Sequence, residues 1–202
     1  MTENLQTVIK GNVDLSDCKN LVRLKGITEI KGYLDLDNCP NFKDLGELIA
    51  VGKFLDLSKT QIKSLGKLRE VGGNLYLYNA TIEDLGKLKK IGGNLNLTET
   101  SVKSLSVLEY IGGDLDLGNA PIKSLGNLKE VGGSLHLSNT KIENLGELKK
   151  VGESLYLRDT QIKDLGKLEK VADDIFLSKD SKITKEYVKK YKPELFWRCR
   201  WM

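Results

Sequence analysis

The single histidine of the chain sits in a pattern that could in principle support acid–base or nucleophilic chemistry. His136 lies between Ser134 and Ser138, and a carboxylate, Asp116, occupies the same position one repeat earlier. Hydrolysis by such a group also needs a pocket and donors that stabilise an oxyanion. The alternating pattern around His136 instead predicts a flat, open strand face. We therefore predict that the protein is not an enzyme.

The three cysteines, Cys18, Cys39 and Cys199, could form a disulfide, a metal site or a reactive thiol. Cys18 and Cys39 occupy the same position of two successive repeats, so we expect them to be inward-pointing neighbours. A zinc site needs four ligands, and His136 lies about five repeats away, so we interpret both as buried thiols. Two flanking arginines could lower the pKa of Cys199, but no His or Asp partner marks it as a nucleophile.

Three aspartates, Asp14, Asp35 and Asp56, recur at one position of successive repeats and could supply oxygen ligands to Ca²⁺. No EF-hand loop and no GGxGxD pattern accompanies them. Double glycines such as Gly72-Gly73 also lack the GxGxxG or Walker context of a phosphate-binding loop. The sequence therefore predicts no cofactor and no metal.

All of these residues are positioned by a repeat of twenty to twenty-one residues. An LxL-like triplet begins nine times, at Val13, Leu34, Leu55, Leu75, Leu95, Leu115, Leu135, Leu155 and Ile175. Within one repeat, Leu75 and Leu77 alternate as in a strand, and further apolar residues follow every three positions, at Ile82, Leu85, Leu88 and Ile91. The pattern predicts an α/β repeat solenoid with one parallel sheet and 3₁₀ or extended returns.

Glycine marks two corners of each repeat. One corner precedes the strand, as at Gly92-Gly93, and the other lies inside an LGxL motif, as at Gly86. Because glycine adopts positive φ without steric penalty, we expect that conformation at both corners.

The segment LYLYNATIEDLGKL resembles the leucine-rich repeat, whose pattern is LxLxxNxLxxLxxL, and the similarity extends from Val13 to about Leu177. The period is similar to that of the twenty-residue bacterial class, and the GGxLxLxxTxI variant resembles tandem repeats of bacterial and bacteriophage proteins. The resemblance implies a right-handed coil whose exposed sheet face binds proteins. The chain departs from the family at the Asn column, which holds Cys18, Cys39, Thr60, Ala80, Thr100, Ala120, Thr140, Thr160 and Asp180. We expect the threonine hydroxyls to bond backbone carbonyls of the next coil.

Strand alternation predicts which side chains point away from the core and could contact a partner. These candidates are Tyr33, Asp35, Asp37, Phe54, Asp56, Tyr76, Tyr78, Asp114, Asp116, His136, Tyr156, Arg158, Asp174 and Phe176. The complete face, which includes Asp14, holds seven aspartates and one arginine, whereas the whole chain carries a net charge of +4. Exposed aromatic residues are typical binding anchors, and an acidic surface favours a Lys/Arg-rich partner. Alternatively, solvated aspartates only protect the sheet against aggregation.

The repeat divides the chain into an N-terminal partial coil (1–12), a solenoid of nine coils (13–178) and a C-terminal cap (179–202). Helical spacing predicts a short capping helix over about Ile183–Lys192, ended by Pro193. The last 24 residues hold eight basic and three acidic residues. Their tryptophans either pack on Phe176 as part of the cap or stack on single-stranded nucleic acid.

The leading hypothesis is a non-catalytic module that binds a basic segment of another protein. One alternative is a bacteriophage or mobile-element inhibitor of a host defence system that binds a host nuclease or its nascent chain. Another is RNA binding through the basic back and the C-terminal tail. The chain has no signal-peptide pattern and no apolar run of about 18 residues, so we expect a cytoplasmic monomer without a membrane segment.

Overall fold

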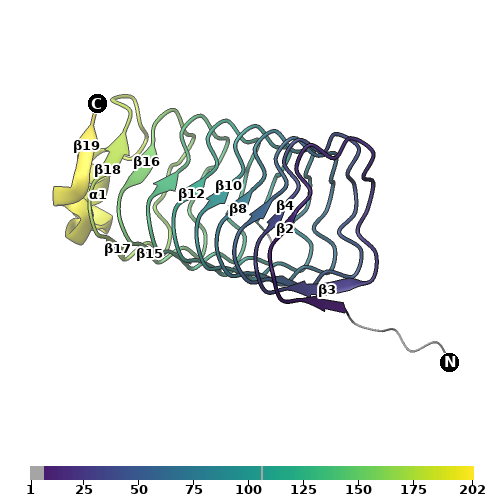
Figure 1. The fold of residues 1–202 in the computed structure, drawn as a ribbon. Coiled ribbons are helices and arrows are strands. Elements are labelled where there is room, and N and C mark those ends of the chain that lie inside the picture. Colours follow the sequence, from purple (N-terminus) through teal and green to yellow (C-terminus); the bar gives the residue numbers. More distant parts are fainter. Residues whose placement is uncertain (1–6, 106) are drawn as a thin grey trace.

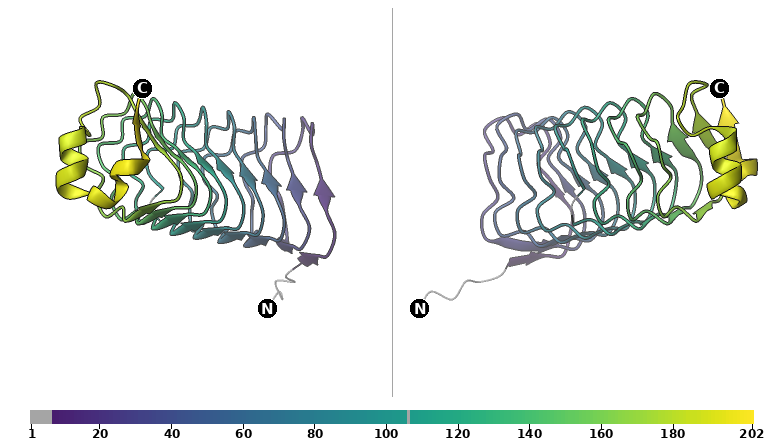
Figure 2. Two further views of the ribbon diagram at one scale, coloured as in Figure 1. Left: turned by 90° about the vertical axis from the view of Figure 1, so that its left-hand side faces the viewer. Right: turned by 180° about the vertical axis from the view of Figure 1, so that it is seen from behind.

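The computed structural model describes residues 7–105 and 107–202, which form a parallel β-solenoid (Figure 1). Each coil contributes one strand to each of two sides, so the described strands form two parallel sheets that run the length of the stack. The first coil and the C-terminal cap lie at opposite ends of the solenoid, as Figure 2 shows. This arrangement confirms the predicted solenoid.

The larger sheet contains ten strands and carries the predicted binding residues. Its strands are β2 (Val13–Asp14), β4 (Leu34–Asp35), β6 (Leu55–Asp56), β8 (Leu75–Tyr76), β10 (Leu95–Asn96), β12 (Leu115–Asp116), β14 (Leu135–His136), β16 (Leu155–Leu157), β18 (Ile175–Leu177) and β19 (Cys199–Trp201). Consecutive strands from β2 to β18 pair without a register shift, since the period is twenty residues along most of the chain.

A second sheet of nine strands runs beside the first, where the sequence predicted only one sheet. Its strands are β1 (Thr7–Ile9), β3 (Ile27–Ile30), β5 (Ala50–Val51), β7 (Glu70–Val71), β9 (Lys90–Ile91), β11 (Tyr110–Ile111), β13 (Glu130–Val131), β15 (Lys150–Val151) and β17 (Lys170–Val171). Most of these strands have two residues and only one inward side chain, so they show no alternation from which a strand could be predicted.

The core consists of the apolar positions that the repeat predicted. Leu75, Leu77, Ile82, Leu85, Leu88 and Ile91 are each at most 2% exposed. Because each coil contributes these side chains to contacts with its neighbours, burial of each is worth roughly 1.5–3 kcal/mol. The returns are extended apart from tight turns. In the coil that contains β8, the Ala80 N–H donates to the Leu77 carbonyl and the Leu88 N–H donates to the Leu85 carbonyl.

The two glycine corners of a coil have glycine for different reasons, and only one of these reasons was predicted. Gly66 and Gly86 of the LGxL motif adopt positive φ, as expected. The expectation of positive φ at the double-glycine corner is wrong, because Gly92 and Gly93 do not adopt it. A Cβ on Gly92 would instead lie 2.1 Å from the Gly72 carbonyl oxygen. Glycine suits this position in the middle coils because the backbones of successive coils approach closely, whereas Lys31 and Ala172 occupy the same position near the two ends of the stack. The other positive φ of each coil falls on Asp17, Asn38, Lys59, Asn79, Glu99, Asn119, Asn139 and Asp159.

The threonines of the Asn column bond differently from the prediction. The Thr60 and Thr100 hydroxyls donate to carbonyls three residues earlier in their own coil, at Leu57 and Leu97, over 2.6 and 2.7 Å. They therefore close a local turn and do not link successive coils. Ala80 omits the hydroxyl, and its backbone N–H still donates to the Leu77 carbonyl.

The C-terminal cap confirms the predicted helix and adds two elements to it. Helix α1 (Lys185–Tyr191) begins at Thr184, whose side chain accepts a hydrogen bond from the Tyr187 N–H. The 3₁₀ helix η1 (Pro193–Arg198) follows directly, and β19 then joins the ten-stranded sheet beside β18. Neither helix is long and apolar enough to cross a membrane, and this holds for every helix in the described ranges.

Candidate protein-binding surface

The ten-stranded sheet presents one continuous column of outward side chains, which we call the central column. In register order it contains Asp14, Asp35, Asp56, Tyr76, Asn96, Asp116, His136, Tyr156, Phe176 and Arg200. The prediction that these aspartates and aromatic residues share one side of the molecule is therefore confirmed. We call this outward side of the ten-stranded sheet the sheet face.

The other predicted residues flank the central column on the same face. Tyr33, Phe54, Asp114 and Asp174 stand two residues before it, and Asp37, Tyr78 and Arg158 stand two residues after it. Most of them are half-buried, because each side chain is covered in part by those of the coils above and below; Tyr78 and Arg158 are more exposed. Strand alternation alone was sufficient to place all of them.

The carboxylates are concentrated at the N-terminal end of the face. Asp14, Asp35, Asp37 and Asp56 lie on the first three coils, and we call this group the acidic patch. Burial raises the pKa of Asp56 above its usual value, and the neighbouring Asp35 and Asp37 carboxylates add to this rise. One of the four, Asp37, already forms an ion pair with Lys59 at 3.3 Å. The remaining carboxylates have no basic partner among the described residues.

Each central-column carboxylate also has a local structural task. Asp35 accepts the N–H of Asp37, and Asp56 accepts the N–H of Ser58, over 3.0 and 2.8 Å. Asn96 makes the same bond to the N–H of Thr98 at 2.9 Å. Since a neutral amide performs this task equally well, the turn requires an acceptor oxygen and does not require a charge.

A second hydrogen-bond ladder precedes the central column, and sequence reasoning missed it. The side-chain oxygens of Asn74 and Asn94 accept the backbone N–H of the next coil at 2.9 and 2.8 Å. Asp114 continues the ladder by accepting the Ser134 N–H at 2.8 Å. The recurrence of Asn or Asp at this position was the available signal. Asp114, proposed as a contact residue, therefore also links two coils.

Aromatic side chains stack in two groups along the face. Tyr33 and Phe54 stack beside the acidic patch, with ring centroids 4.5 Å apart and planes inclined by 10°. Near the C-terminal end, His136, Tyr156 and Phe176 form an aromatic ladder with centroid separations of 4.3 and 4.8 Å. The coil spacing of a parallel sheet, about 4.8 Å, suits such stacking.

Arg200 joins the sheet face through β19, which the sequence did not predict to be a strand. Its guanidinium lies 2.7 Å from an Asp174 carboxylate oxygen. In the register of β19, Arg200 is opposite Phe176, while Trp201 is opposite the inward residue Leu177. The expected packing of the tryptophans on Phe176 is therefore wrong, because alternation along β19 turns Trp201 inward. The C-terminal end of the face is consequently less acidic than predicted.

The other candidate chemical sites are not assembled. No group of three or more His, Cys, Asp or Glu side chains in the described ranges is placed to hold a metal ion. Cys18, Cys39 and Cys199 are free thiols, and the Cys39 thiol donates to the Leu15 carbonyl. Burial raises the pKa of Cys199 to about 11, and Arg200 offsets only part of this effect. The net shift is upward because burial outweighs the lowering by Arg200 that the sequence suggested.

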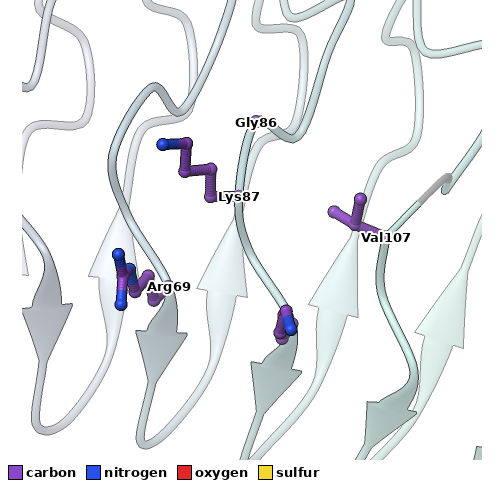
Figure 3. Close-up of a pocket in the computed structure, with 5 residues that line it drawn as sticks. Arg69, Gly86, Lys87 and Val107 are labelled. Atoms are coloured by element: carbon purple, nitrogen blue, oxygen red, sulfur yellow. The ribbon is translucent and has the colours of Figure 1, made fainter.

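On the sides away from the sheet face, lysines and glutamates of successive coils pair with one another. The pairs include Glu47–Lys67, Lys63–Glu83, Glu70–Lys90, Glu109–Lys129, Glu130–Lys150, Glu143–Lys163 and Glu147–Lys167. A hollow of about 360 Å³ interrupts this pattern at Arg69, Gly86, Lys87, Lys89 and Val107 (Figure 3). Val107 follows Lys87 in its column, and Glu109, which follows Lys89 in its column, pairs with Lys129. Arg69, Lys87 and Lys89 have no ion-pair partner among the described residues.

Comparison of the chain with protein-family models, with curated proteins and with solved structures found no significant match. The resemblance to leucine-rich repeats therefore stays a prediction, and the function is inferred from the surface itself.

Proposed function

We propose that the protein is a non-catalytic binding module whose sheet face holds a Lys/Arg-rich segment of another protein. The observation that carries this proposal is the acidic patch with the Tyr33–Phe54 stack beside it. A basic segment that lies along the patch neutralises carboxylates that crowd one another in the free protein. The resemblance to leucine-rich repeats supports the same use of the face.

The fold requires an acceptor oxygen at each position of the central column in the acidic patch, but it does not require a negative charge there. Asn96 shows that a neutral side chain satisfies the turn N–H, yet Asp14, Asp35 and Asp56 carry a charge at that position. Stacked carboxylates repel one another, and the raised pKa of Asp56 reflects this together with burial. A cationic partner gives these charges a role, because it gains ion pairs at a preformed, partly desolvated surface.

The aromatic residues determine which cation suits the patch. Tyr33 and Phe54 are half-buried and stacked on one another, and the Tyr76 ring lies 6.4 Å from Phe54. A guanidinium can lie against such a partly exposed ring while it donates to a carboxylate. Arginine does both at once, whereas lysine provides a single compact charge. We therefore expect arginine-containing segments to bind more tightly than lysine-only segments of equal charge.

The test is the affinity of fluorescently labelled Arg-rich and Lys-rich peptides, measured by anisotropy at several salt concentrations. The double variant Asp35→Asn, Asp56→Asn retains both acceptor oxygens and removes two charges. We expect it to weaken binding of the Arg-rich peptide by about fivefold to tenfold at low salt.

A matched control is available on another side of the coil. Asp84 accepts the Gly86 N–H at 2.9 Å in the same type of turn, so Asp84→Asn removes a charge without loss of the local bond. Binding should be almost unchanged in this variant. Equal losses in the Asp84 and the Asp35/Asp56 variants, or no binding of either peptide at low salt, would refute the proposal.

A further inference from the structure

The most exposed large aromatic side chain of the described residues belongs to the C-terminal cap. Trp197, in η1, is 80% exposed, whereas Trp201 is half-buried and donates its indole N–H to the Ile183 carbonyl. Phe196 also packs against the core, and Leu195 and Cys199 are buried. The cap is thus closed by the neighbours of Trp197, and Trp197 itself contributes little to it.

Several cations of the cap lie near this tryptophan. The Lys189 ammonium lies 4.9 Å from the Phe196 ring centroid, and that ring lies 5.3 Å from the Trp197 ring. Arg198 follows Trp197 in the chain and is exposed, and Arg200 donates to the Trp197 carbonyl at 2.8 Å. Lys190 lies over the exposed ring of Tyr191 on the same helix. Neither Lys189 nor Arg198 is ion-paired with another described residue.

This combination selects an anionic partner that has flat rings. A nearly free indole can stack with a nucleobase, and adjacent ammonium and guanidinium groups can contact the phosphates on either side of it. Lysine is depleted in protein–protein interfaces, and the cap carries six lysines against two arginines. A folded duplex would not present its base faces to Trp197, whereas a single strand does.

We propose that the C-terminal cap is a second binding site, which takes single-stranded nucleic acid by stacking a base on Trp197 between phosphates held by Lys189 and Arg198. The site is separate from the acidic patch, because β2, β4 and β6 lie at the opposite end of the sheet from β19, and the patch repels phosphate. It does not depend on the function proposed for the sheet face.

The primary experiment is a titration of the full-length protein into labelled oligo(dT) and oligo(U), followed by anisotropy between low and physiological salt. Contacts with two to three phosphates predict a logarithmic salt slope of about −1.5 to −2. Trp197→Ala should weaken binding at least about fivefold, and Trp197→Phe should restore part of the loss because a ring remains. Trp201→Phe leaves Trp197 as the only tryptophan, and its fluorescence should be quenched by the oligonucleotide.

Charge controls separate this site from general attraction to a basic protein. Lys189→Glu and Arg198→Glu should each weaken binding severalfold, whereas Lys141→Glu, an exposed position on an internal coil, should have little effect.

Lys87→Glu tests whether the oligonucleotide binds at the basic hollow of Figure 3 instead. A larger loss for Lys87→Glu than for Lys189→Glu would overturn the proposal. Insensitivity to Trp197→Ala, or tighter binding of poly-glutamate than of the oligonucleotides, would overturn it as well. The Asp35→Asn, Asp56→Asn variant should bind both oligonucleotides as the unmodified protein does.

Discussion

At the residue scale, a carboxylate on the sheet face can combine a structural hydrogen bond with a negative charge, and the two roles can be separated. Asp35 and Asp56 accept a turn N–H, as Asn96 does, and they also carry charge that the turn does not need. The pKa of Asp56 is raised, whereas that of Asp164, away from this face, is lowered. The Tyr187 hydroxyl donates a hydrogen bond to Asp164 at 2.6 Å, and this bond favours the ionised carboxylate. The surroundings therefore destabilise the ionised form of the carboxyl group at Asp56 and stabilise it at Asp164.

This contrast predicts opposite effects of neutralising the two aspartates. The pKa of Asp56 is raised in the folded state, so its contribution to stability is lost as pH rises through that pKa. Asp56→Asn should therefore increase the free energy of unfolding at pH 7 relative to the unmodified protein and change it little at pH 3. Urea denaturation at the two pH values measures this.

Asp164→Asn is the counterpart, because the pKa of Asp164 is lowered and its stabilising effect is present only above the unfolded-state pKa. This variant should be less stable than the unmodified protein at pH 7, and the difference should shrink at pH 3. A loss of stability at pH 7 in the Asp56 variant would contradict the role of burial and crowding at that carboxylate.

Thiol reactivity gives a second prediction at this scale. Burial raises the pKa of Cys199 to about 11, so only about one thiol in a thousand is ionised at pH 8. Cys18 is partly exposed in the first coil. In the folded protein, a disulfide reagent should modify Cys18 at least about tenfold faster than Cys199, as peptide mass spectrometry at timed intervals would show. Cys18→Ser identifies the fast phase, and rapid modification of Cys199 would show that the cap opens readily.

At the element scale, the corners of each coil fix the path of the chain. At the double-glycine corner the backbone of one coil leaves no room for a Cβ from the next, and at the turn after β10 a non-glycine residue, Glu99, adopts φ of +58°. The first corner favours glycine in the middle coils because of a neighbouring backbone, although Lys31 and Ala172 occupy it near the two ends of the stack. The second corner would favour glycine because of its own torsion angle.

Substitutions at the two corners should therefore change stability in opposite directions. Gly112→Ala places a Cβ 2.1 Å from the Gly92 carbonyl oxygen, so we expect a loss of about 2 kcal/mol or more in the free energy of unfolding. Glu99→Gly relieves an unfavourable φ and should raise that free energy by about 0.5–1 kcal/mol, net of the added entropy of the unfolded chain. Chemical denaturation of the two variants measures both effects, and a tolerated Gly112→Ala would mean that successive coils can separate locally.

Most of the fold could be predicted at this scale, and the failures have identifiable causes. The inward positions from Leu75 to Ile91 and the shared side of Asp35 and Tyr76 follow from period and alternation alone. The nine-stranded sheet was missed because two-residue strands show no periodicity. β19 was missed because its pairing with β18 depends on how η1 turns the chain back toward the solenoid. Such contacts between distant segments leave no local pattern.

At the scale of the whole molecule, the solenoid distributes different chemistry along its length. The acidic patch occupies the first coils, the aromatic ladder the later ones, and the basic cap the last turn of the chain. Every coil has the same backbone, so the side chains of each coil can vary on the outside without cost to the core. This separation would let the sheet face and the cap serve the two binding roles proposed above.

The last prediction tests this modular architecture. Deletion of twenty residues, 71–90, removes one complete coil and joins Glu70 to Ile91. Ile91 is the register partner of Val71, so it can take the inward position of Val71. The shortened protein should fold, unfold cooperatively at a somewhat lower temperature, and still bind the Arg-rich peptide, because the acidic patch lies entirely before the deletion.

Deletion of ten residues, 71–80, puts the following coils out of phase and should abolish folding, since inward and outward positions no longer match from coil to coil. Circular dichroism and thermal denaturation distinguish the two variants. Equal damage from both deletions would show that the coils are not interchangeable, and loss of peptide binding in a folded twenty-residue deletion would place essential contacts beyond the acidic patch.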